Sequence, residues 1–139
     1  MAISHFACML AVAAELHLPP RVLPAIQAIE GGRVRMSRMN SNGTEDLGLM
    51  QVNSLWLSAV ARHTGQPSAA VRDKLIQDGC FNIAVAGAIL RVYLREARGD
   101  LLAAVGNYHS HTPIRHRAYQ LRVAGAALKM FGGRTKNTQ

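Results

Sequence analysis

The sequence predicts a mainly α-helical domain, and three observations support this prediction. Apolar residues recur three and four positions apart in several segments, as they do along one face of a helix. No stretch of useful length alternates apolar and polar residues. The 139 residues, 49% hydrophobic and 17% charged, can build a core and are not typical of a disordered chain. We therefore expect one domain over residues 1–133, followed by a flexible basic tail over residues 134–139.

Four helices are predicted in the first part of the chain. Glycine, proline and capping residues mark their ends, because these residues stop a helix or satisfy its free backbone groups. Their predicted positions are a first helix capped by Ser4 and running to about Leu16, a second from Pro24 to Glu30, a third that begins at Ser54 and ends before Gly65, and a fourth capped by Ser68.

The second part of the chain predicts three more helices. The longest covers Asn82 to Arg98 and ends at Gly99, and Asp100 caps the next one, Leu101–Val105. The last helix opens at Thr112-Pro113 and runs to Gly132. The one exception to the helical pattern is a small β-hairpin, which we expect within residues 40–48 because Asn42-Gly43 is a strong turn dipeptide.

Glu30 is the first candidate for chemistry. It lies in the last turn of a mostly apolar helix, immediately before Gly31-Gly32. Burial there disfavours the charged carboxylate, and so does the negative end of the helix dipole, so both raise its pKa. A carboxyl group that keeps its proton near neutral pH can act as a general acid. A solvated glutamate at a helix end is the alternative.

The segments around Glu30 carry a resemblance to a known family. AIEGG, followed by NSNGTEDLGLMQVNSLWL, resembles the catalytic core of lytic transglycosylases with a lysozyme-like SLT domain. The chain is most similar to the small periplasmic members associated with conjugation, type III and type IV secretion and type IV pili. The resemblance implies cleavage of the β-1,4 bond between N-acetylmuramic acid and N-acetylglucosamine, with Glu30 as the acid and 1,6-anhydro ends as products. It implies no metal and no organic cofactor.

The same resemblance implies a set of substrate-binding residues. Met50, Gln51 and Asn53 would line the cleft, with Asn42 contributing from the turn. The segment Ala104–Ser110 resembles the family's tyrosine motif, and Tyr108 matches its tyrosine, which implies a hydroxyl close to Glu30. Asn107 stands where this motif commonly has a small residue. A tyrosine in the core, without a role in catalysis, is the alternative.

Asp46 is a possible second carboxylate. Two-carboxylate glycosidases need an acid on each side of the scissile bond, and Glu45 and Asp46 are the nearby candidates. Asp46 precedes Leu47-Gly48 as the aspartate of the family motif does. With Asp46 in catalysis, the chain would be a lysozyme-type hydrolase on the same fold. With Glu30 alone, it would be a transglycosylase, and Asp46 would shape the turn.

Cys8 and Cys80 are too few and too widely spaced for a zinc-finger pattern. Two buried free thiols are one interpretation. The family resemblance favours a disulfide between them, and therefore an oxidising compartment such as the periplasm. The segment Phe6–Ala14 resembles a short signal-peptide core but lacks a basic region before it, so we expect an exported protein whose signal peptide is absent from this sequence.

The net charge of +8 predicts an anionic partner. Peptidoglycan glycan strands, with their peptide carboxylates, fit the site motifs, whereas nucleic acid does not. No apolar run reaches the roughly 20 residues of a membrane span. A non-enzymatic wall-binding or nucleic-acid-binding subunit of a transfer machine is the alternative from another class. Three histidines, at 109, 111 and 116, have no carboxylate nearby in the sequence, so we expect no metal site.

Overall fold

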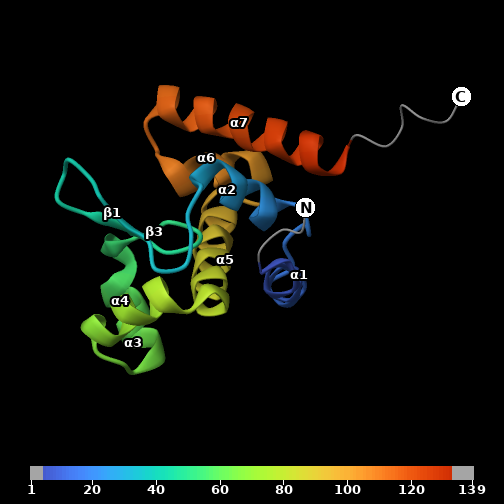
Figure 1. Cartoon of the computed structure of the whole chain (residues 1–139). Coiled ribbons are helices and arrows are strands. Elements are labelled where there is room, and N and C mark those ends of the chain that lie inside the picture. Colours follow the sequence, from blue (N-terminus) through green and yellow to red (C-terminus); the bar gives the residue numbers. More distant parts are fainter. Residues whose placement is uncertain (1–4, 133–139) are drawn as a thin grey trace, which may run out of the picture.

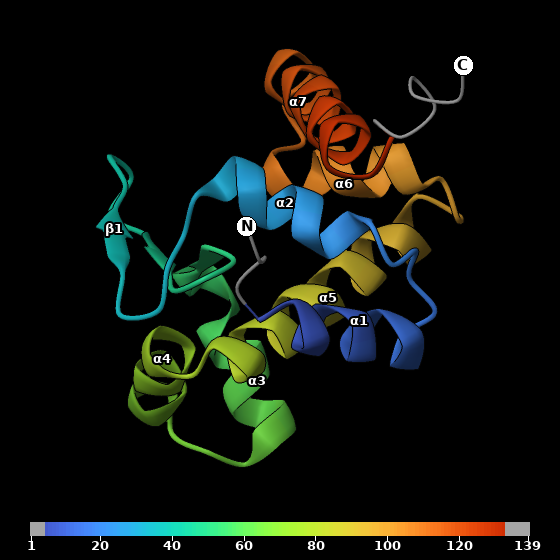
Figure 2. The same ribbon diagram turned by 45° about the vertical axis from the view of Figure 1, so that its right-hand side comes forward.

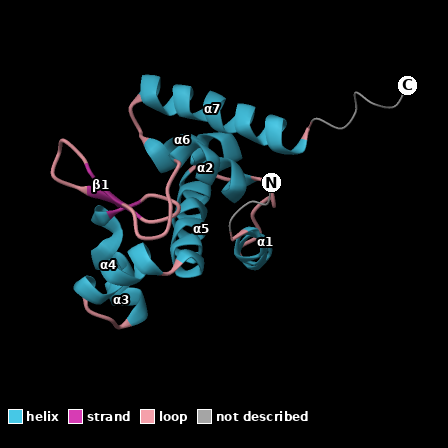
Figure 3. Ribbon diagram, viewed as in Figure 1, coloured by secondary structure: helices cyan, strands magenta, loops and turns pink. Residues whose placement is uncertain are grey.

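The computed structural model describes residues 5–132 and confirms the mainly helical prediction. Helices form wherever the apolar spacing predicts them, and a small sheet interrupts their order (Figure 3). The elements are α1 (Phe6–Glu15), α2 (Val22–Glu30), β1 (Ser37–Met39), β2 (Glu45–Leu47), β3 (Val52–Asn53), a 3₁₀ turn η1 (Ser54–Trp56), α3 (Leu57–Thr64), α4 (Ser68–Gln77), α5 (Gly79–Glu96), α6 (Leu101–His109) and α7 (Pro113–Phe131).

Helix α5 is the centre of the arrangement. It packs against α1, α4 and α6, while α7 lies across α2 and α6 at one end of the molecule (Figures 1 and 2). Ile83, Ala86 and Leu90 of α5 are completely buried, because they recur on one face of the helix. Leu23 and Ile26 of α2 join the same core. The core therefore holds the end of α2, where Glu30 lies, against the rest of the molecule.

Several helix ends differ from the sequence prediction. Helix α1 begins at Phe6 with His5 at its N-cap, one residue later than predicted, and Ser4 lies outside the described residues. Helix α2 begins at Val22, so Pro24 is in the first turn, where its missing N–H costs nothing. Ser68 was predicted to be a cap but is the first helical residue, with Pro67 before it.

The first two helices of the second part, α5 and α6, differ from their predicted ranges. Helix α5 starts at Gly79, because the side chain of Asp78 accepts a hydrogen bond from the backbone N–H of Phe81. Helix α6 extends to His109 instead of Val105, although Asp100 caps it as predicted. Helix α7 matches its predicted range, Thr112-Pro113 to Gly132. The predicted tail over residues 134–139 lies outside the described residues.

The predicted hairpin exists, but it is larger than expected. Its strands β1 and β2 pair on either side of a turn at residues 40–44, where Gly43 has a φ of +86°. A third strand, β3, was not predicted and pairs with β2 in an antiparallel sheet of order β1-β2-β3. Two residues are too few for a recognisable alternation. The sheet forms the wall that faces Glu30.

Asn82 holds the base of this sheet. Its side chain lies inside the core, where its Nδ2 donates to the carbonyl groups of Leu47 and Leu75 at 2.8 and 2.9 Å. Its Oδ1 accepts a hydrogen bond from the backbone N–H of Met50 at 2.8 Å. Gly48 permits this contact, because a Cβ there would collide with Asn82 and with the Leu75 carbonyl. One buried amide thus joins α5 to β2, α4 and the turn before β3.

A disulfide joins Cys8 and Cys80, with 5.6 Å between their Cα atoms. The bond confirms the pairing that the family resemblance implied. It fastens α1 to the start of α5, and it encloses α2, the sheet, α3 and α4 in one covalent loop. Among residues 5–132, no single helix is both long and apolar enough to cross a bilayer, and the bent pair α4 and α5 meets that test only when taken together.

Candidate active site

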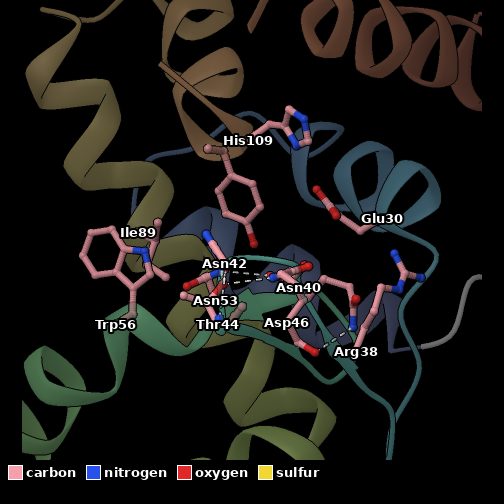
Figure 4. A pocket seen from close by; sticks show the side chains of 13 residues that line it. Glu30, Arg38, Asn40, Asn42, Thr44, Asp46, Asn53, Trp56, Ile89 and His109 are labelled. Carbon is pink, nitrogen blue, oxygen red and sulfur yellow. Dashed lines mark hydrogen bonds between the residues drawn. The ribbon is translucent and has the colours of Figure 1, made fainter. Parts of the chain in front are cut away.

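A cavity of about 400 Å³ lies between the end of α2, the sheet and the helices α5 and α6. Figure 4 shows Glu30 and His109 on one side of the cavity, and a group of polar side chains from the sheet facing them. The lining combines acids, amides and aromatic rings: Glu30, Arg38, Asn40, Asn42, Thr44, Asp46, Gln51, Val52, Asn53, Trp56, Ile89, Tyr108 and His109. In ligand sites, polar groups of this kind fix the orientation of the bound molecule.

Glu30 occupies the position that the sequence predicts. It is the last residue of α2, and the helix ends there because Gly31 adopts a left-handed conformation with a φ of +66°. Burial raises the pKa of Glu30 above its ordinary value, and the negative charge of Asp46 adds to this effect. A hydrogen bond from Tyr119 and the charges of Arg122 and Arg38 lower it, but burial dominates.

Tyr119 is a site residue that the sequence analysis missed. Its hydroxyl donates a hydrogen bond of 2.6 Å to Glu30 Oε2, and its side chain is only 2% exposed. The ring of His109 stacks on the tyrosine ring at 4.6 Å between centroids, with the planes 5° apart. A buried tyrosine usually places its hydroxyl on a partner. In the sequence, the four-residue spacing of Tyr119 and Val123 is consistent with a buried face of a helix, but it does not reveal the contact with Glu30.

Tyr108 lines the cavity, and its hydroxyl is held by a backbone group. It donates to the backbone carbonyl of Met50 at 3.1 Å, and the tyrosine that hydrogen-bonds Glu30 is Tyr119. Burial, followed by the negative charges of Glu30 and Asp46, raises the pKa of Tyr108, so the hydroxyl keeps its proton. Its observed contact fixes the turn before β3 against α6.

Met50 does not line the cavity with its side chain, contrary to the expectation. That side chain is completely buried, because Met50 belongs to the apolar core under the sheet. Gln51 does line the cavity, although it is only 5% exposed. Its Nε2 donates to the carbonyl of Gly48 at 3.0 Å, whereas its buried Oε1 has no hydrogen-bond partner among the described residues. A buried acceptor without a donor is costly, and a ligand with an N–H or O–H group would satisfy it.

The facing wall is a network of short polar side chains. Asn53 Nδ2 donates to Asp46 Oδ1 and to Thr44 Oγ1, each at 3.1 Å. Asn42 Oδ1 accepts from the backbone N–H and from the hydroxyl of Thr44 at 3.0 and 2.7 Å. These bonds place Asn42, Asp46 and Asn53 at one wall of the cavity. The contacts fix the side chains before any ligand arrives.

The other candidate acid, Glu45, is used elsewhere. Its carboxylate forms two hydrogen bonds with the Arg72 guanidinium on α4, at 2.7 and 2.9 Å, and these bonds hold its pKa below the ordinary value. Because neighbouring residues of a strand point to opposite faces, Asp46 faces the cavity and Glu45 does not. Asp46 is therefore the carboxylate that lines the cavity together with Glu30.

The histidines make separate contacts. Burial, with the nearby charges of Arg122 and Arg115, lowers the pKa of His109, which favours its neutral form against Tyr119. His111 Nε2 lies 2.8 Å from the carboxylate of Glu96 on α5. In the part of the chain that the structure describes, no group of three or more His, Cys, Asp or Glu side chains is placed to hold a metal ion.

Comparison with known families bears on this site. The family model described as Transglycosylase SLT domain matches residues 7–125. The match spans most of the chain and includes every lining residue of the cavity as well as Tyr119. It confirms the lysozyme-like fold and the family that the motifs around Glu30 predicted. No curated protein matches the chain at a significant level.

Proposed function

Since the chain belongs to the transglycosylase SLT domain family, we propose that it cleaves the β-1,4 bond between N-acetylmuramic acid and N-acetylglucosamine and leaves 1,6-anhydro ends. The family supports a peptidoglycan-acting enzyme of the lytic transglycosylase type. One observation carries the finer proposal. Glu30, a carboxyl whose pKa is raised by burial, lines a cavity whose facing wall is an ordered set of amides and hydroxyls.

In the first step, protonated Glu30 acts as the general acid. It gives its proton to the glycosidic oxygen while the bond from that oxygen to C1 of the muramoyl residue breaks, so N-acetylglucosamine leaves with a free 4-hydroxyl group. The raised pKa serves this step because it keeps the proton on Glu30 at higher pH than an ordinary glutamate would. The substrate's own N-acetyl group can stabilise the positive charge that develops at C1.

In the second step, ionised Glu30 acts as the base. It removes the proton of the muramoyl C6 hydroxyl, and O6 attacks C1 to close the 1,6-anhydro ring. Glu30 regains its proton, and no water is consumed. The hydroxyl of Tyr119 supports this step, because its 2.6 Å hydrogen bond stabilises the carboxylate that the first step creates. The attacking hydroxyl belongs to the same sugar, which gives it a high effective concentration.

The facing wall supports binding of the glycan. The unpaired Gln51 Oε1 can accept a hydrogen bond from a sugar hydroxyl or acetamido N–H, and Asn42 and Asn53 offer further polar contacts at the same cavity. We assign Asp46 to this wall rather than to a covalent role, and its hydrogen bond from Asn53 holds it within the polar network there. Its negative charge also helps to keep Glu30 protonated.

We further propose that the protein works in the periplasm and opens the wall locally for a secretion, conjugation or type IV pilus apparatus. The Cys8–Cys80 disulfide supports an oxidising compartment, because such bonds persist where thiols are not kept reduced. The glycan substrate of the family lies outside the cytoplasmic membrane, which is compatible with the same compartment. The apparatus rests on the motif resemblance alone.

Mass spectrometry of the products from purified sacculi tests this proposal. Wild-type protein should release muropeptides with 1,6-anhydro ends, lighter by one water than hydrolysis products. Glu30→Gln should lose more than about 100-fold in rate, since the amide cannot deliver a proton. Asp46→Asn is the matched variant on the facing wall and should leave the product type unchanged.

Two other outcomes would contradict the proposal. Ordinary reducing ends as the main product, abolished equally by Glu30→Gln and Asp46→Asn, would make the protein a two-carboxylate hydrolase. Sacculi left intact by folded protein, together with tight binding of wall fragments or salt-sensitive binding of nucleic acid, would make it a binding subunit. Turnover by Glu30→Gln within tenfold of wild type would remove Glu30 from the reaction.

A further inference from the structure

The outer side of α7 carries a regular line of exposed aliphatic side chains. Ile114, Leu121 and Leu128 are 82%, 64% and 70% exposed, and they recur every seven residues. Two small residues, Ala118 and Gly125, lie between them at alternating spacings of four and three. We call these five residues the α7 seam. A seven-residue repeat of this form is the pattern of a helix that pairs with another helix.

The α7 seam lies opposite the face that α7 buries in its own fold. Tyr119 and Val123 point inward toward α2 and α6. At 100° of rotation per residue, the seam is centred about half a turn away from that pair. Figures 1 and 2 show α7 at the margin of the molecule, with α2 and α6 on one side of it. The seam is therefore not part of the core, and its three large apolar residues are accessible to a partner.

A row of positive charges runs along one edge of the seam. Arg115, Arg122 and Lys129 each follow a large seam residue by one position, and all three are exposed. In a helix pair, such positions flank the apolar contact, and charges there form salt bridges that determine which partner binds. No aspartate or glutamate follows Asp100 in the whole sequence, so α7 carries no carboxylate to balance this row. The complementary partner is acidic at its own flanking positions.

The same features argue against two other occupants. One alternative is a dimer in which the α7 helices of two copies pair. The basic row of one copy would then face either the basic row of the other or the other edge of its seam, which consists of Arg117, Ala124 and Phe131 and has no acid. Helices that lie on membranes usually present a broad apolar face with Trp or Phe. The α7 seam is a narrow line interrupted by Ala118 and Gly125, which suits the close approach of another helix.

We propose that the α7 seam and its basic row form a docking surface for one amphipathic helix of a protein partner, with apolar residues at a seven-residue repeat and acidic residues beside them. This surface lies outside the lining of the cavity, although the charge of Arg122 also acts on Glu30, and the proposal does not depend on the reaction proposed there. The small seam residues leave room for large apolar side chains of the partner, and the basic row pairs with its acids.

A designed peptide that carries these partner features can test the surface directly. The probe is a labelled helix of about four heptads with Leu on its seam and Glu at both flanking rows, where the acids prevent its pairing with itself. A second peptide carries Lys in place of Glu, and vesicles of phosphatidylglycerol and phosphatidylethanolamine form a third probe. Fluorescence anisotropy should detect binding of the Glu peptide only, weakened by salt, with hydrogen-exchange protection over residues 113–131.

Matched variants make the result specific. Leu121→Ser should weaken binding of the Glu peptide at least about tenfold, because central apolar anchors carry most of the energy of an interface. Leu55→Ser is the control, since Leu55 is 76% exposed on η1, away from α7. The double variant Arg115→Glu with Lys129→Glu should lose the Glu peptide and gain the Lys peptide. Arg122 is left unchanged because its charge acts on Glu30.

Three results would overturn the proposal. Absence of Glu-peptide binding, or equal loss in Leu121→Ser and Leu55→Ser, would remove the surface. Binding to the vesicles without binding to the peptide would assign the α7 seam to lipid. A concentration-dependent dimer in light scattering, abolished by Leu121→Ser, would assign it to a second copy of the chain. Circular dichroism of each variant confirms that a lost signal does not come from an unfolded α7.

Discussion

Replacement of Tyr119 by phenylalanine isolates one hydrogen bond of the site. The ring of Tyr119 is buried and stacks on His109, and phenylalanine keeps both features. The change removes only the hydroxyl that donates to Glu30 Oε2 at 2.6 Å. This bond favours the ionised form of Glu30, so its loss raises the pKa of Glu30 further. The variant therefore alters proton affinity while the shape of the site stays the same.

The magnitude follows from the strength of a hydrogen bond to a charged group, about 1.5–3 kcal/mol. About 1.4 kcal/mol corresponds to one pKa unit. The basic limb of the pH–rate profile should therefore move to higher pH by at least about one unit. The second step needs the carboxylate as a base, so the maximal rate should fall as the profile broadens. At pH values where wild-type Glu30 is ionised, the variant should also be less stable, because a buried charge has lost its donor.

The assay is release of soluble muropeptides from sacculi at a series of pH values, with thermal unfolding measured in the same buffers. Tyr93→Phe is the matched control, because Tyr93 lies on α5 against Trp56 and His111 and has no contact with Glu30. The control should leave the basic limb in place. If the limb stays unchanged in Tyr119→Phe, or moves to lower pH, the stabilisation of Glu30 by Tyr119 is refuted.

Three further predictions concern stability. The folded-state pKa of Glu30 is raised, so its protonation stabilises the fold at low pH, and this contribution is lost as pH rises through the folded pKa. Glutamine at position 30 does not ionise, so the free energy of unfolding of Glu30→Gln should increase relative to that of wild type in urea titrations from pH 4 to 8. Reduction of Cys8–Cys80, which are 72 residues apart, should cost about 4 kcal/mol by loop entropy, and an unchanged melting temperature after reduction would contradict this. Asn82→Ala should cost more than about 3 kcal/mol in chemical denaturation, because it strands three buried backbone groups; a loss below about 1 kcal/mol would mean that water replaces the amide.

Local patterns in the sequence predict the fold well where one segment determines its own structure. The end of α2 and the start of α6 follow from Gly31 and Asp100, because a left-handed glycine and a capping aspartate act within a few residues. Strand β3 was not predicted, since two residues form a strand only when β2 is present to pair with them. Helix α5 begins at Gly79, three residues before the predicted start at Asn82, because the side chain of Asp78 caps it.

In the candidate site, too, some residues can be identified from their own segment and others only from the structure. Glu30 is recognisable from its own helix, its glycines and the motif that follows it. Tyr119 is not, because its contact with Glu30 joins residues 89 positions apart and depends on how α7 crosses α2. The prediction that Met50 lines the cleft was wrong for a related reason. The motif places Met50 beside Gln51 but does not determine which of the two side chains faces the core. Partners that only tertiary packing brings together need the structure.

The position of Tyr119 in the chain has a consequence for what supports Glu30. Both carboxylates of the cavity, and both cysteines of the disulfide, precede α6, whereas the donor to Glu30 belongs to the last helix. In the proposed reaction, the support of Glu30 as a base therefore depends on a helix outside the cavity lining, through the packing of α7 against α2.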